Sequence, residues 1–286
     1  MSRILVIGAT GFLGAKIFSI LEKDHEIIGT YSSSPIRSYV YLDIKDKDRV
    51  LEEIREIKPD VIIHTAAYSN PDDCEKNPDL AEKINHKGTA NIVEAAKEID
   101  AILVYTSSAY IFDGKEGNYT EENIPTPLNI LGKTKLDGEN EIRKYLEKYI
   151  ILRFAISYGF NGYGRNNAFF GEILKGKKLE VNNDQIRQPL LIDDLAQIID
   201  GLIKKGAYGI FNVAGPQEMT KYQLGVALEK LIRPYSLLTA VTSEKDYAPR
   251  PKYGTLVTSK LAGLGFITKP LDEGLKIIKK QKNIGS

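Results

Sequence analysis

Cysteine is almost absent from this sequence, and Cys74 is the only one among 286 residues. A lone cysteine excludes a disulfide framework and a cysteine-based metal site. Charge of one sign is not in excess either, because 39 lysines and arginines against 38 aspartates and glutamates leave a formal net charge of +1. No apolar run reaches the roughly 18 residues that span a bilayer, and the first apolar stretch is too short for a signal peptide. The sequence therefore predicts a soluble, cytoplasmic protein without affinity for nucleic acid or membranes.

Motifs of several enzyme classes are missing as well. The three histidines, His25, His64 and His86, belong to no histidine–carboxylate cluster with the spacing of metal ligands, so no catalytic metal is expected. The Gly-x-Ser-x-Gly sequence that forms the nucleophile elbow of many hydrolases is also absent. These absences leave the strand pattern and the glycine-rich segments to indicate function.

Short β-rich runs alternate with amphipathic segments through the first half of the chain. The predicted strands are Ile4–Ile7, Glu26–Tyr31, Val61–Thr65, Ile102–Thr106 and Ile150–Phe154. The predicted helices are Phe12–Glu22, Lys47–Ile57, Asp79–Glu98 and Lys133–Glu147. Most of these strands are apolar at consecutive positions, which suits a parallel sheet covered on both faces. The order predicts an α/β fold with a Rossmann-like, doubly wound parallel sheet.

A glycine-rich turn lies between the first predicted strand and the first predicted helix. Gly8-Ala9-Thr10-Gly11-Phe12-Leu13-Gly14 has the G-x-x-G-x-x-G spacing of a dinucleotide-binding fingerprint. Gly8 permits the tight turn, Gly11 lets the backbone approach a pyrophosphate, and Gly14 allows close packing of helix against strand. The N-terminus of the helix adds free N–H groups for the phosphates. The whole segment therefore predicts a nicotinamide dinucleotide site.

The end of the second predicted strand favours NADP(H) as the cofactor. Many NAD-binding folds carry an acidic residue there, which binds the ribose 2′-hydroxyl. The segment from Thr30 to Arg37 has no carboxylate but several hydroxyls and one arginine, which suit a 2′-phosphate. We therefore expect contacts to NADP(H) from Tyr31, Ser32 and Arg37, the alternative being that Arg37 only lies on a surface loop.

The pattern of elements changes after Tyr158, where residues 159–167 are rich in glycine and asparagine and predict a loop. A further strand is expected at Ile210–Val213, followed by short helices and a proline-rich bend. We expect a dinucleotide-binding core over residues 1–160, to which residues 188–214 return. Residues 161–187 and 215–286 are expected to form a smaller substrate-binding part.

Three further motifs carry a resemblance to a known family. They are His64-Thr65-Ala66-Ala67-Tyr68, the string from Thr106 to Gly114, and Gly132-Lys133-Thr134-Lys135-Leu136-Asp137-Gly138-Glu139. With the glycine loop, they resemble the extended short-chain dehydrogenase/reductases, and most of all the dTDP-4-dehydrorhamnose reductase branch. That branch also contains the regulatory beta subunit of methionine adenosyltransferase. The likeness continues through Gln217–Tyr222 and Arg250-Pro251-Lys252, so it covers nearly the whole chain.

This resemblance implies hydride transfer between a nicotinamide cofactor and a sugar C4 carbonyl or hydroxyl. In the family, a tyrosine exchanges the proton, a lysine four residues later holds the nicotinamide ribose, and a serine or threonine bonds to the same oxygen. The hydroxyl corresponds to Ser108 and the lysine to Lys135. The resemblance also implies that the cofactor cleft is contacted or shaped by Asp43, Ile44, Ala66, Ala67, Tyr68 and Asn85.

The tyrosine of the family is absent from this chain. Its place is taken by Leu131, in the string Asn129-Ile130-Leu131-Gly132-Lys133-Thr134-Lys135. Leucine can neither exchange a proton nor donate to an oxyanion. Loss of a positioned general acid typically costs about 10²–10⁴-fold in rate. The site is therefore expected to bind a cofactor and to be poorly equipped to use it.

Three interpretations of Leu131 stay open at this stage. It is a natural loss that leaves a cofactor-binding protein with little or no reductase activity. Or another group, such as Ser108, Tyr158 or a water held by Lys135, replaces the tyrosine. Or the leucine was introduced artificially.

The resemblance weakens where the sugar is expected to bind. Ile156 stands where rhamnose reductases often carry an aromatic residue, and Ala109 follows Ser108 where the branch usually has an aspartate. Arg187 and Arg250 are expected to reach the sugar or its diphosphate, since a guanidinium binds phosphate in a bidentate manner. The alternative for each arginine is a structural ion pair.

Two functions follow from the resemblance. The first is NADP(H)-dependent reduction of a 4-keto deoxysugar nucleotide, with Ser108 and Lys135 polarising the C4 oxygen. The second is a regulatory subunit that binds NADP(H) and docks on a partner enzyme. A homodimer is compatible with either function.

Overall fold

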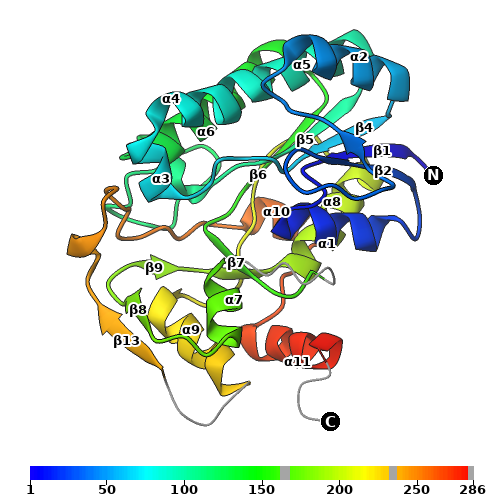
Figure 1. The fold of residues 1–286 in the computed structure, drawn as a ribbon. Helices are drawn as coiled ribbons and strands as arrows, with labels where there is room; N and C mark the ends of the chain where they lie inside the picture. Colours follow the sequence, from blue (N-terminus) through cyan, green and yellow to red (C-terminus); the bar gives the residue numbers. More distant parts are fainter. Residues whose placement is uncertain (162–167, 232–236, 283–286) are drawn as a thin grey trace.

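A seven-stranded parallel sheet forms the centre of the protein, as shown by the computed structural model, which describes residues 1–161, 168–231 and 237–282 (Figure 1). Its spatial order is β11 (Gly209–Asn212), β6 (Tyr149–Arg153), β5 (Ile102–Thr106), β4 (Val61–His64), β1 (Arg3–Ile7), β2 (Glu26–Tyr31) and β3 (Val40–Tyr41). All neighbouring strands pair in parallel. The expected doubly wound α/β fold is confirmed.

Helices cover both faces of this sheet because successive residues of each strand point to opposite sides. On β1, Ile4 and Val6 pack with α1 (Phe12–Leu21) and α8 (Ile192–Lys205). Leu5 and Ile7 pack on the other face, where α2 (Lys47–Ile57), α5 (Gly88–Glu98) and α6 (Ile130–Tyr145) lie. This two-sided burial explains why the strands are apolar at consecutive positions.

Two helix predictions need correction. The single helix expected over Asp79–Glu98 is instead α4 (Pro78–Ala81), a π-helix η1 (Glu82–Lys87) and α5. A π-helical turn is wider than an α-helical one, so it changes the direction in which the side chains point. Such turns are frequent at functional sites. The helix expected at Lys133 begins earlier, at Ile130, because the side chain of Asn129 caps it by accepting a hydrogen bond from the Gly132 N–H at 2.8 Å. Leu131 therefore lies in the first turn of α6.

A second cluster of elements lies below the sheet in Figure 1. It is built around the buried rings of Tyr158 and Phe170. Its elements are β7 (Ile156–Tyr158), α7 (Ala168–Leu174), β8 (Leu179–Asn182), β9 (Ile186–Arg187), β10 (Pro189–Leu191), β12 (Met219–Thr220), α9 (Lys221–Lys230), β13 (Leu238–Val241) and α11 (Leu271–Lys282). Most of the predicted loop at 159–167, namely residues 162–167, lies outside the described residues.

The remaining elements are short. They are α3 (Pro71–Lys76), η2 (Ala109–Ile111), η3 (Ser243–Lys245) and α10 (Ser259–Gly263). Between the two clusters the chain returns to the large sheet through α8 and β11. The exact domain boundaries stay a prediction. In the described part of the chain, no helix is both long and apolar enough to cross a membrane.

Candidate functional site

A cleft of about 650 Å³ opens at the carboxyl ends of β1, β2, β4 and β5. This edge is where open parallel sheets usually bind their ligands. The cleft is lined by the glycine loop, by the ends of β4 and β5, by the start of α6 and by residues 154–157 after β6. Segments far apart in the sequence therefore meet in one hollow.

The glycine loop has the close packing that a dinucleotide site needs. Gly8 has a positive φ of 83°, which favours glycine, and its carbonyl accepts a hydrogen bond from the Gly11 N–H at 2.9 Å. A Cβ added at Gly14 would lie 2.2 Å from the Gly8 carbonyl oxygen, so only glycine fits there. The N-cap residue of α1 is Gly11, which has no side chain to cap the helix, and Phe12 and Leu13 at the start of α1 line the cleft. The loop can thus present backbone N–H groups to phosphate.

Lys135 is buried on α6 at the floor of the cleft. Its Nζ donates a hydrogen bond to the Thr106 carbonyl at 2.9 Å and lies 4.7 Å from the centre of the Tyr105 ring. Burial lowers the pKa of Lys135 to about 8, against the opposing effect of the Glu139 carboxylate. The lysine is therefore a desolvated cation at neutral pH, held by a carbonyl at the end of β5.

Leu131 lies beside Lys135 on the cleft wall, and its surroundings are apolar. It is buried in a cluster with Cys74 and Ala81, against which the rings of Tyr68 and Tyr110 pack. The Cys74 thiol donates to the Tyr68 carbonyl at 3.1 Å, and burial raises the pKa of this thiol to about 11. Leu131 has no proton to exchange, and the thiol of Cys74 does not line the cleft, so neither is placed to replace the tyrosine as an acid.

Asn85 links the loop after β4 to α6 through hydrogen bonds. Its Oδ1 accepts from the Tyr68 N–H at 2.8 Å, while its Nδ2 donates to the Tyr68 carbonyl at 2.9 Å and to the Thr134 Oγ1 at 3.1 Å. Asn85 is fully buried in the π-helical turn and does not line the cleft. It positions the residues that do.

The structure brings together most of the predicted cofactor residues. Those that line the cleft are Gly8, Thr10, Gly11, Phe12, Leu13, Gly14, Ser32, Ala66, Ala67 and Lys135. Those that do not line it are Tyr31, Arg37, Asp43, Ile44, Tyr68 and Asn85. Ile44 is buried in the core, and the Asp43 carboxylate pairs with Lys45 at 3.3 Å. Cofactor contacts from this second group stay predictions.

The predicted substrate residues divide in a similar way. Ser108 and Ile156 line the cleft, whereas Arg187 and Arg250 do not. Arg187 is buried and donates to the carbonyls of Ile186 and Pro251, each at 2.7 Å. Arg250 pairs with carboxylates, and its substrate contact, like that of Arg187, stays a prediction.

Tyr158, which the sequence offered as a substitute proton donor, lies elsewhere. Its ring is fully buried in the second cluster, and a Cβ at Gly274 of α11 would lie 2.1 Å from its hydroxyl. Tyr158 does not line the cleft, so it cannot reach a ligand there. Of the groups offered as a substitute donor, Tyr158 is therefore set aside, because its side chain lies against α11.

Tyr110 is one of several cleft residues that were not among the predicted site residues. It follows Ser108 by two positions, in the short helical turn η2, and it lines the cleft. Its N–H donates to the Ser108 Oγ at 3.2 Å. The sequence signal was the position of Tyr110, two residues after the predicted hydroxyl of Ser108.

The structure corrects the expectation about histidine–carboxylate clusters. Glu82 and His86 of η1 meet Asp137 of α6, with ligand atoms within 4.8 Å of one another. All three side chains are half-buried, and His86 Nδ1 lies 2.7 Å from Glu82 Oε1. Because Asp137 lies far from His86 along the chain, the sequence alone does not indicate this cluster.

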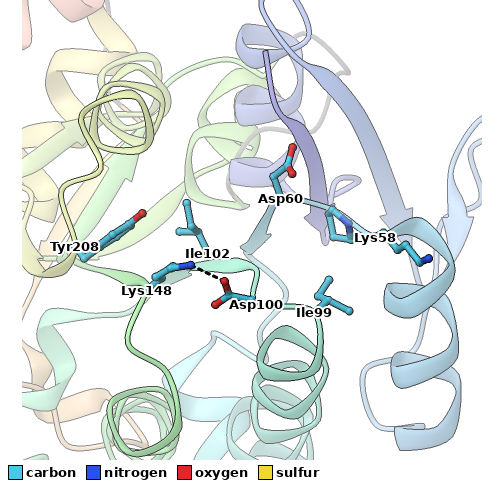
Figure 2. A pocket seen from close by; sticks show the side chains of 8 residues that line it. Lys58, Asp60, Ile99, Asp100, Ile102, Lys148 and Tyr208 are labelled. Carbon is cyan, nitrogen blue, oxygen red and sulfur yellow. Dashed lines mark hydrogen bonds and ion pairs between the residues drawn. The ribbon is translucent and has the colours of Figure 1, made fainter.

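A second hollow lies at the opposite end of the sheet (Figure 2). Its volume is about 530 Å³, and Lys58, Asp60, Ile99, Asp100, Ile102, Lys148 and Tyr208 lie around it. Lys148 pairs with Asp100 at 2.6 Å. Because this hollow lies at the amino ends of β4 and β5, it does not share residues with the glycine loop.

Comparisons with known proteins agree with this geometry. The family model of the RmlD substrate binding domain matches residues 1–282. Subunit beta of methionine adenosyltransferase 2 from Mus musculus is 32% identical over 96% of this chain and 86% of its own. The dTDP-4-dehydrorhamnose reductase of Aggregatibacter actinomycetemcomitans is 32% identical over 91% of this chain and 92% of its own. The Bacillus anthracis dTDP-4-dehydrorhamnose reductase, solved in complex with NADP, is 30% identical with a TM-score of 0.88, covering 98% of this chain and 99% of its own.

Proposed function

The chain belongs to the RmlD substrate binding domain family, and from this premise we propose that it binds NADP(H) in the cleft and reduces a 4-keto deoxysugar nucleotide. The proposal rests mainly on one observation, which is that Lys135, Ser108 and the glycine loop all line the same cleft. The dTDP-4-dehydrorhamnose reductase from Bacillus anthracis, solved with NADP, supports the choice of cofactor. The lack of a carboxylate in Ser32–Arg37 agrees with a 2′-phosphate.

The residues present fit such a cofactor. Gly8, Gly11 and Gly14 line the cleft, where their backbone would lie against a pyrophosphate, and the start of α1 would offer its N–H groups. Lys135 would hold the nicotinamide ribose, since its ammonium can donate beyond the Thr106 carbonyl. When bound, the reduced nicotinamide supplies a hydride.

At the substrate, Ser108 would donate a hydrogen bond to the C4 oxygen. Its Oγ already accepts from the Tyr110 N–H, so the hydroxyl hydrogen is free to point into the cleft. Leu131 has no proton to offer, and the reduction therefore needs a donor at another position. Of the interpretations of Leu131, the proposal adopts the one in which another group replaces the tyrosine.

A regulatory role is the second candidate, and the burial of Leu131 among apolar side chains favours it. Subunit beta of methionine adenosyltransferase 2 is as similar to this chain as a reductase is. In this role the protein would bind NADP(H), dock on a partner enzyme and turn over slowly or not at all. A homodimer is compatible with both roles, and a cytoplasmic location stays a prediction.

The test compares the native chain with Leu131→Tyr in NADPH oxidation with dTDP-4-dehydrorhamnose. We expect measurable turnover by the native chain and a gain of about 10²-fold or more in the variant, since a positioned acid contributes that much. NADPH binding, followed by the fluorescence of the cofactor, is measured on both proteins as a control. If both bind NADPH and neither oxidises it with this sugar, this substrate is excluded and the regulatory role is supported.

A further inference from the structure

We propose that Tyr110 donates the proton that Leu131 cannot provide. The proposal rests on the reductase function argued above, and it assigns a catalytic residue within the same cleft. Three observations support it. Tyr110 lies beside Ser108 and Leu131, its hydroxyl oxygen accepts a hydrogen bond from a cation, and the other groups near Leu131 are less suited to donate a proton.

Tyr110 lies between the predicted hydroxyl and the position of the missing tyrosine. Its N–H donates to the Ser108 Oγ at 3.2 Å. Its backbone touches the first turn of α6, because a Cβ at Gly132 would lie 2.1 Å from the Tyr110 carbonyl oxygen. Its ring packs against the apolar cluster that contains Leu131, and it lines the cleft. A phenol is therefore present next to residue 131, supplied by η2 instead of α6.

The hydroxyl of Tyr110 is held in a way that leaves its proton available. Arg250 Nη1 lies 3.3 Å from the Tyr110 hydroxyl oxygen. A guanidinium can only donate, so this contact occupies a lone pair of the oxygen and leaves the hydroxyl hydrogen free. That hydrogen can be directed at an acceptor in the cleft, such as the C4 oxygen of a substrate.

The same contact favours the charge that remains after proton transfer. Arg250 is fixed by Asp72 at 2.7 Å and by Asp246 at 2.6 Å. The guanidinium of Arg187 lies 5.9 Å from the centre of the Tyr110 ring. A hydrogen bond from a cation to an anionic oxygen is roughly twice as strong as a neutral one, so Arg250 would bind the phenolate more tightly than the phenol.

The reaction balances with this donor. The C4 carbon gains a hydride from NADPH, which is oxidised to NADP⁺, and the carbonyl π bond breaks. The electron pair goes to the C4 oxygen, which forms a new O–H bond as the Tyr110 O–H bond breaks. The phenolate then takes a proton from water in the cleft. Ser108 keeps its hydrogen bond to the same oxygen.

The other groups near Leu131 are less suitable. The Cys74 thiol is buried, donates its hydrogen to the Tyr68 carbonyl and does not line the cleft. Tyr158 does not line the cleft. Lys135 is the real competitor, because it lines the cleft and its pKa is lowered to about 8, although one of its hydrogens is taken by the Thr106 carbonyl.

The test is a double-mutant cycle with four proteins: the native chain, Tyr110→Phe, Leu131→Tyr and the double variant. We expect Tyr110→Phe to lower kcat by about 10²–10⁴-fold in the native background. In the Leu131→Tyr background the same change should cost less than about tenfold, since a second phenol is available. A purely structural role of Tyr110 would cost the same in both backgrounds. Tyr247→Phe, at a tyrosine that is 64% exposed, is the matched control and should leave kcat unchanged.

Several outcomes would overturn the assignment. Equal losses in both backgrounds would make Tyr110 a structural residue. An unchanged kcat in Tyr110→Phe, with a kcat at saturating NADPH that falls as the pH rises through about 8, would assign the proton to Lys135. An inert native chain beside an active Leu131→Tyr would show a cleft that lacks a donor, so the inference about Tyr110 fails together with the reductase activity of the native chain. An active native chain whose kcat is unchanged in Tyr110→Phe would overturn the inference about Tyr110 alone. If all four proteins bind NADPH and none is active, the reductase function itself fails.

Discussion

Glu139 and Arg153 form a buried ion pair beneath the cleft, with Glu139 Oε2 2.6 Å from Arg153 Nη2 and side-chain exposures of 0% and 1%. Glu139 lies one turn after Lys135 on α6, and Arg153 ends β6. The Ser107 hydroxyl also donates to Glu139, at 2.5 Å. The pair therefore ties together the three elements that carry Lys135, Ser108 and the wall after β6.

We expect Glu139→Gln to destabilise the protein strongly. The change leaves the Arg153 guanidinium buried without a compensating charge, which typically costs about 3–5 kcal/mol in the free energy of unfolding. Urea denaturation measures this loss. Glu141→Gln, on the same helix but half-buried and 3.8 Å from His86, is the control and should cost about 1 kcal/mol or less. Equal losses in the two variants would mean that the buried pair adds no more than a surface contact.

Local patterns predicted the parts of the site that depend on neighbouring residues. The glycine loop follows from its spacing, and the bounds of β2 and α2 follow from runs of a few residues. Ser108 and Lys135 were implied by short motifs that resemble those of the family. The contact of Tyr110 with Arg250 and the pairing of Glu139 with Arg153 join residues from different elements, so no spacing along the chain indicates them. The hydrogen bonds of Asn85, in the π-helical turn, to Tyr68 likewise join two elements. The early start of α6 had a local signal in Asn129, a favoured helix-capping residue.

Gly14→Ala should abolish cofactor binding and lower stability. The added Cβ would meet the Gly8 carbonyl oxygen at 2.2 Å, so α1 must move away from the turn that forms the phosphate site. NADPH titration and thermal unfolding measure the two effects. Gly263→Ala is the control, because no atom lies within 4 Å of an added Cβ, and this glycine is exposed on the helix α10. The control should keep full cofactor binding and gain about 0.4–1 kcal/mol in stability. Normal NADPH affinity in Gly14→Ala would contradict the role of the loop.

Arg37→Ala should weaken binding of NADPH more than binding of NADH. Arg37 is exposed on the segment after β2 and does not line the cleft, so its side chain would have to turn towards a 2′-phosphate. A charge-assisted hydrogen bond of this kind contributes about 1.5–3 kcal/mol, which corresponds to roughly 10–150-fold in Kd. Calorimetric titration of both cofactors gives the ratio. If NADH binds more tightly than NADPH and the variant changes neither affinity, the preference for NADP(H) is wrong.

Binding of NADPH should weaken as the pH rises through about 8, because Lys135 then loses its charge. Burial lowers the pKa of this lysine from 10.5 to about 8. Below pH 8 the ammonium is protonated and attracts the anionic dinucleotide, whereas above it the neutral amine does not. If binding requires the ammonium, Kd rises towards tenfold per pH unit above the pKa, as proton linkage demands. Fluorescence titration of NADPH between pH 7 and 9.5 measures this slope.

Lys135→Arg keeps its charge throughout that range and should bind with a Kd that hardly changes with pH. A flat profile in the native protein would show that the charge of Lys135 contributes nothing to cofactor binding.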